Sequence, residues 1–150
     1  MSTNKIIFKN GLLIYSCIVA FFLLMKVLGL DNVSELRFLN FLFVFYGVNR
    51  AIKQNIDLNE QESYFNNFYV GFGSSVIGIA LTIIGLIVYV GFIDSSFMSV
   101  LENSSLWGKE LSLEMVVFAL SIEGTASSVM CSFILMQYYK NYKPATGVLT

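Results

Sequence analysis

An uncharged run from residue 68 to residue 93 constrains this chain more than any other feature of its sequence. A helix needs about 20 mostly apolar residues to cross the hydrocarbon core of a bilayer, and this run is long enough. A membrane strand would instead alternate polar and apolar residues over about ten positions and would need a closed barrel. Continuous apolar runs favour helices, whose backbone groups are hydrogen-bonded within the segment.

Three further segments have the length and composition of membrane spans, namely 6–30, 36–52 and 115–139. The second is rich in aromatic residues, and the fourth carries a single charge, Glu123. We therefore predict an all-α membrane protein, a bundle of four transmembrane helices that forms one domain over residues 1–150. We expect the first segment to be a retained helix, because no clear small-residue cleavage site precedes Asp31.

The composition excludes several functional classes. Charged residues make up only 13% of the chain and hydrophobic residues 56%, whereas a soluble domain has about a quarter of its residues charged. The chain has no histidine, which excludes histidine-based acid–base chemistry, and its net charge of −1 gives no basic surface for nucleic acid. Cys17 and Cys131 lie in apolar segments without a metal-binding spacing, so we expect free thiols. We predict no metal, no cofactor and no catalytic residues.

The distribution of Lys and Arg predicts the orientation in the membrane, because cytoplasmic flanks carry more of them. In the four-span arrangement, six basic residues lie on the side of both termini and three on the other. The first group comprises Lys5, Lys9, Arg50, Lys53, Lys140 and Lys143, and the second comprises Lys26, Arg37 and Lys109. We expect both termini, and a polar loop at 53–67, to be cytoplasmic. The outer loop at 94–114 could hold a short interfacial helix, 95–102, with its apolar side toward lipid.

Glu123 is the residue of the membrane segments that most suggests a function. It lies about 14 Å along the helix from Glu114, at about 1.5 Å per residue, which is near the middle of a bilayer core. An ionisable side chain there is costly, and such groups are often functional. Small residues follow it at 124–128, so we expect Glu123 to face protein, with Tyr46 and Thr82 as hydrogen-bonding partners at the same depth. Glu123 is then either a structural protonated acid or a proton- or ligand-binding carboxyl.

Small residues recur four positions apart on the third and fourth segments. Residues at this spacing share one face of a helix, and small side chains allow a second helix to approach closely. These faces could serve packing within the bundle or contact between copies of the chain. The residues are Gly71 and Ser75, then Ser74, Gly78 and Thr82, and in the fourth segment Gly124, Ser128 and Ser132.

Several short motifs resemble those of an uncharacterised bacterial family of four-helix integral membrane proteins. The resemblance covers about residues 8–142 and implies a location in the bacterial inner membrane, without implying an activity. The motifs are Phe8-Lys-Asn-Gly-Leu, Tyr46-Gly-Val-Asn-Arg-Ala-Ile-Lys, Phe68-Tyr-Val-Gly-Phe-Gly, the stretch 89–94, and Glu123-Gly-Thr.

The sequence favours a non-enzymatic role. Short loops and the absence of catalytic groups predict a scaffold or accessory subunit that acts through helix–helix contacts, in a larger membrane complex or in a homo-oligomer. The alternative is a small oligomeric transporter or channel that uses Glu123 as an intramembrane carboxyl. A membrane enzyme acting on lipids is a third possibility, which no motif supports.

Overall fold

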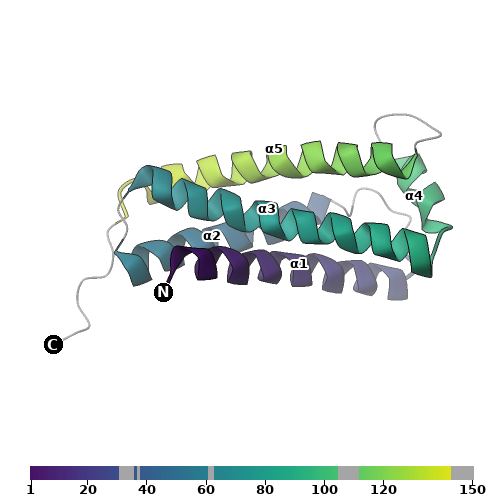
Figure 1. Cartoon of the computed structure of the whole chain (residues 1–150), viewed down its shortest axis with the longest axis horizontal. Helices are drawn as coiled ribbons and strands as arrows, with labels where there is room; N and C mark the ends of the chain where they lie inside the picture. The colour runs from purple at the N-terminus through teal and green to yellow at the C-terminus, as the bar shows by residue number, and fades with distance from the viewer. Residues whose placement is uncertain (31–35, 37, 61–62, 105–111, 143–150) are drawn as a thin grey trace.

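The computed structural model describes residues 1–30, 36, 38–60, 63–104 and 112–142 of the chain. All regular structure within these ranges is helical (Figure 1). The elements are α1 (Thr3–Val27), α2 (Leu39–Asn59), α3 (Tyr64–Val88), the π-helical η2 (Tyr89–Ile93), α4 (Phe97–Ser104) and α5 (Leu113–Tyr139).

The four long helices lie side by side along one axis, and α3 contacts each of the other three. The start of α1, the end of α2, the start of α3 and the end of α5 lie at one end of the bundle, whereas α4 lies at the other (Figure 1). Ile14, Val48, Ile52 and Leu135 form the main apolar core between α1, α2 and α5. We call the end that holds the start of α1 the N-terminal end and the other the α4 end.

Three helices of the described chain are long and apolar enough to cross a membrane: Thr3–Val27, Tyr64–Ile93 and Leu113–Tyr139. They correspond to the predicted first, third and fourth segments. α2 does not reach the same apolar content, because its second half carries Arg50, Lys53 and Asp57. The prediction that the chain is helical and suited to a membrane is therefore confirmed at this level.

The boundaries of α2 differ from those predicted. We expected a helix over 36–52 and a loop over 53–67, but α2 runs from Leu39 to Asn59 and α3 begins at Tyr64. The amide side chains in the polar half of α2 form hydrogen bonds with α1 and α3. These bonds stabilise this segment as a helix, whereas we had expected a loop in contact with water.

The short helix that follows η2 also differs from the prediction. α4 covers Phe97–Ser104, two residues later than expected. Phe97 and Leu101 are almost fully buried, and they pack with Val90 and Val116 rather than facing lipid. An amphipathic helix can bury its apolar side in lipid or in protein, and here the end of the bundle supplies the protein surface.

Candidate functional site

Glu123 lies on the exposed side of α5, so in the single chain its side chain does not pack between α5 and another described helix. The next residue explains this. A Cβ atom built on Gly124 would lie 2.6 Å from Cγ2 of Ile79, so Gly124 is the residue that faces α3. Successive residues of a helix point about 100° apart, since one turn takes 3.6 residues, and Glu123 therefore turns outward.

The two expected partners of Glu123 lie in different surroundings. The Thr82 hydroxyl donates a 2.8 Å hydrogen bond to the Gly78 carbonyl of its own helix. Tyr46 is 54% exposed on α2. Thr82 lines an apolar groove at the α4 end, whereas Tyr46 and Glu123 do not. The structure therefore does not bring the three side chains into one site.

The small residues of α3 and α5 lie in contacts within the chain. A Cβ atom on Gly78 would approach the Cβ of Ile14 at 2.8 Å, and one on Gly71 would approach the Ile52 side chain at 2.9 Å. Close approach of α1 and α2 to α3 thus depends on glycine at these positions. The predicted serines, which are all buried, are Ser74, Ser75, Ser128 and Ser132.

Side-chain amides connect three helices at the N-terminal end. We call Asn10, Gln54, Asn55, Asn59 and Asn67 the amide network. The Asn10 amide donates to Gln54 Oε1 at 2.9 Å and to the Ile6 carbonyl. The Asn55 amide donates to Asn67 Oδ1 at 2.8 Å, and the Asn59 amide donates to Asn55 Oδ1 at 3.0 Å. Asn10, Asn55 and Asn67 are each at most 2% exposed, so the network is a buried connection between α1, α2 and α3.

Two tyrosines attach the end of α5 to α2. The Tyr139 hydroxyl donates a 2.7 Å hydrogen bond to Asn49 Oδ1, and the Tyr142 hydroxyl donates to Asp57 Oδ1 at 3.2 Å. Loss of hydration raises the pKa of Tyr142, and the nearby Asp57 carboxylate raises it further. Sequence reasoning missed these contacts and the amide network. The one signal in the sequence was the recurrence of amides in the polar half of α2.

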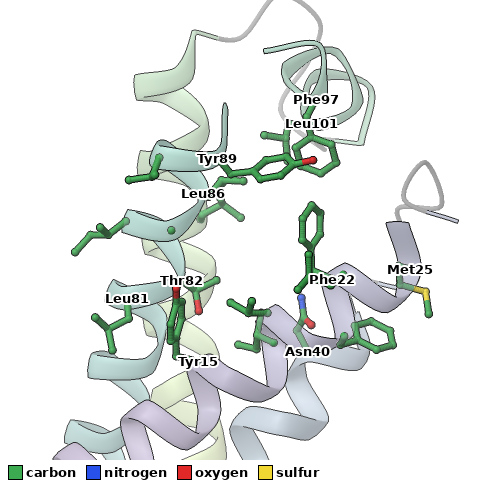
Figure 2. Close-up of a pocket in the computed structure, with 18 of the residues that line it drawn as sticks. Tyr15, Phe22, Met25, Asn40, Leu81, Thr82, Leu86, Tyr89, Phe97 and Leu101 are labelled. Carbon is green, nitrogen blue, oxygen red and sulfur yellow. The ribbon is translucent and has the colours of Figure 1, made fainter. Parts of the chain in front are cut away.

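The apolar groove at the α4 end has a volume of about 600 Å³ (Figure 2). α2 has 21 residues, while α3 and η2 together have 30, so α2 leaves part of α1 and α3 without a neighbour. Leu86 and Tyr89 lie on one wall, Phe22 lies opposite, and Phe97 of α4 lies above (Figure 2). The lining is Tyr15, Ile18, Val19, Phe21, Phe22, Leu23, Met25, Leu30, Leu36, Asn40, Leu81, Thr82, Ile84, Gly85, Leu86, Val88, Tyr89, Ile93, Phe97, Val100, Leu101 and Leu120.

Few polar atoms interrupt the groove wall. Asn40 Oδ1 is buried and accepts no hydrogen bond from the described residues. The Tyr15 ring packs along α3 at Gly85, where its hydroxyl would lie 3.3 Å from an added Cβ. The described part of the lining contains no carboxylate, thiol or amine, so its surface is mostly apolar. An asparagine and tyrosines within apolar segments were the only sequence signal for it.

An ion pair lies at the outer end of the groove. The Lys26 ammonium donates to Asp94 Oδ2 at 3.2 Å and to the Tyr89 hydroxyl, and it lies 4.7 Å from the centroid of the Tyr89 ring. Ser96 donates a hydrogen bond to Asp94 Oδ1. This bond, together with Lys26, lowers the pKa of Asp94, so the carboxylate is charged at neutral pH. Both members of the pair are partly exposed.

No family model, curated protein or solved structure matches this chain. The resemblance to a family of four-helix membrane proteins therefore stays a prediction. Any function of the chain has to be inferred from its own helices and groove.

Proposed function

We propose that the chain is a multi-pass protein of the bacterial inner membrane, with four spans and both termini in the cytoplasm. The geometry supports α2 as the fourth span. Its 21 residues measure about 31 Å at about 1.5 Å per residue, close to the thickness of a bilayer core, with the apolar half in the bilayer and Arg50, Lys53 and Asp57 toward the cytoplasmic side. An even number of spans also agrees with the position of the start of α1 and the end of α5 at one end of the bundle.

In this membrane the protein acts as a scaffold or accessory subunit through helix–helix contacts. The observation that carries this proposal is a stripe on the exposed face of α5. Its members recur at alternating spacings of three and four, the period at which two helices pack along a common seam. The α5 stripe comprises Glu123, Ala126, Met130, Phe133 and Gln137, all exposed in the single chain.

The composition of the α5 stripe suits contact with another membrane helix. Ala126 is small, and Glu123 and Gln137 can hydrogen-bond across an interface, where such bonds contribute about 0.6 kcal/mol on average and up to about 2 kcal/mol. Gln137 facing lipid would be costly. A partner helix, from a larger complex or from a second copy, accounts for both observations.

Cysteine cross-linking in native membranes tests the interface. In a chain without Cys17 and Cys131, Ala126→Cys should give a defined cross-linked product with a partner or a second copy. Ala20→Cys is the matched control, because Ala20 is also an exposed alanine, but on α1. Equal cross-linking at the two positions, or none at Ala126, would show that the α5 stripe is not an interface.

A second candidate, an oligomeric transporter or channel, rests on the position of Glu123. In a ring of copies that meet through the α5 stripe, this carboxyl would lie on a shared central path. Glu123→Gln should then abolish proton or cation flux through vesicles while thermal stability stays the same. For an accessory subunit, Glu123→Gln should preserve assembly, because the amide keeps the size and hydrogen-bonding capacity of a neutral acid, and Glu123→Leu should weaken it.

A further inference from the structure

The groove at the α4 end has the length of one leaflet of the bilayer. Its lining extends along α1 from Tyr15 to Met25 and along α3 and η2 from Leu81 to Ile93. At about 1.5 Å per residue these stretches measure roughly 15 and 18 Å, about half of a hydrocarbon core of about 30 Å. A helix from another protein would need the whole thickness, whereas a single acyl chain occupies one leaflet.

The groove is also open to its surroundings. Leu23, Ile84 and Ile93 belong to the lining, and each is at least 52% exposed. Its volume of about 600 Å³ lies within the range of roughly 300–1,000 Å³ that is usual for sites of small ligands. A molecule in the bilayer could therefore enter from the side without any unfolding of the bundle.

The outer end of the groove presents two opposite charges side by side. Lys26 follows Met25 directly, and Asp94 follows Ile93, so the ion pair lies just beyond the two lining stretches that the groove follows. Both side chains are partly exposed, at 39% and 30%, and can accept further partners. Their charges cancel, so the rim does not favour an anionic headgroup over a zwitterionic one. A headgroup that carries both charges can place its phosphate on Lys26 and its ammonium on Asp94.

We propose that the groove binds one acyl chain of a zwitterionic phospholipid whose headgroup carries a primary ammonium and lies on the Lys26–Asp94 pair. A primary ammonium donates hydrogen bonds to the carboxylate, which a quaternary ammonium lacks. The face of Tyr89, which could otherwise attract a quaternary ammonium, already contacts Lys26. This lipid site is separate from the α5 stripe and does not depend on the proposed role in assembly.

Native mass spectrometry of the full-length protein tests the proposal. The protein is extracted in a mild detergent, delipidated, and offered phosphatidylethanolamine, phosphatidylcholine or phosphatidylglycerol with identical acyl chains. We expect one phosphatidylethanolamine per chain to be retained, at least tenfold more tightly than either of the others. Absence of a retained lipid, or preference for phosphatidylglycerol, would overturn the proposal.

Substitutions locate the lipid on the molecule. Val88→Trp fills the groove and should reduce retention at least tenfold, whereas Ile87→Trp, at an exposed neighbour outside the lining, should leave it unchanged. Equal losses in the two variants would contradict the assignment to the groove. A second chain bound in place of lipid, detected as a dimer that Val88→Trp disrupts, would also overturn it.

The contact between the lipid headgroup and the Lys26–Asp94 pair can be tested without changing a buried residue. Lys26→Gln combined with Asp94→Asn changes only partly exposed side chains, so folding should be preserved. This double variant should still retain one lipid but lose the preference for phosphatidylethanolamine over phosphatidylcholine. An unchanged preference would show that the pair does not contact the headgroup.

Discussion

The four long helices pack differently at the two ends of the bundle. At the N-terminal end, α2 reaches its neighbours, and buried amides bond across three helices. At the α4 end, α2 begins only partway along its neighbours, and its first turn, with Asn40, borders an apolar groove. Buried amides must be matched to specific partners, because an unpaired one costs about 1–3 kcal/mol. The comparison indicates that buried hydrogen bonds fix the arrangement of the helices at the N-terminal end, while the α4 end leaves an apolar groove between them.

Replacing glycine by leucine should give the largest difference in stability between a tightly packed position and the α4 end. At Gly78, near the middle of α3, a Cβ would meet Ile14 at 2.8 Å and the Gly11 carbonyl at 3.0 Å. We expect Gly78→Leu to lower the free energy of unfolding by about 3 kcal/mol, near the upper end of overpacking effects. Gly91→Leu, in η2 with nothing within 4 Å, should change it by less than about 0.5 kcal/mol. Thermal unfolding in detergent measures both, and similar losses would mean that the α4 end is packed as tightly as the rest.

Two asparagines of α2, one near each end of the bundle, allow the stability contributed by the two ends to be compared. Asn55 is fully buried and bonds to Asn59 and Asn67, so Asn55→Leu should cost about 2 kcal/mol by leaving buried partners unsatisfied. Asn40 Oδ1 accepts no bond from the described residues, so Asn40→Leu should be neutral or stabilising. Denaturant unfolding in micelles compares the two variants. A larger loss at Asn40 would mean that the groove, rather than the amide network, holds α2.

The hydrogen bond that attaches α5 to α2 should contribute less to stability than the amide network does. Tyr139→Phe removes the 2.7 Å hydrogen bond to Asn49 and keeps the ring, so we expect a loss of about 1 kcal/mol. Tyr138→Phe is the control, because Tyr138 is exposed on the same helix and should be near neutral. Calorimetric melting temperatures of the two variants check this, and identical values would leave the Asn49 bond without a role in stability.

The smallest effect on thermal stability should come from the Lys26–Asp94 ion pair at the end of the groove. Because Ser96 and Lys26 lower the pKa of Asp94 below its ordinary value of 3.8, its contribution to stability is complete above that pH. It is lost as the pH falls through the lowered pKa. The chain and its Asp94→Asn variant should therefore differ slightly in melting temperature at pH 7, and this difference should shrink as the pH falls below 3.8. A difference that persists unchanged at pH 3 would point to another cause.

Much of the fold could be predicted from hydropathy alone. The run at 68–93 and the segments at 6–30 and 115–139 match helices that can cross a membrane, because apolar length is a local property of the sequence. Cys17 and Cys131 are free thiols, as expected. The end of α2 could not be placed in this way, because its polar residues add no apolar length and several of their hydrogen-bonding partners lie on other helices.

The candidate site was much less predictable. The depth of Glu123 follows from counting residues, but its direction depends on which neighbour faces α3, and Gly124 takes that place. The groove arises from the lengths and relative positions of three helices, so no single motif indicates it.

The sequence by itself determined that this chain is helical and suited to a bilayer, because about 20 apolar residues in a row are stable across lipid only as a helix. It also determined which residues are small enough for close helix contact. Only the tertiary structure decided which helix faces meet. Gly71, Gly78 and Gly124 lie in contacts between helices of the chain, whereas Glu123 lies on an exposed face. The physical reason is that helix formation depends on local hydrogen bonds, whereas pairing of faces depends on contacts between residues far apart in the chain.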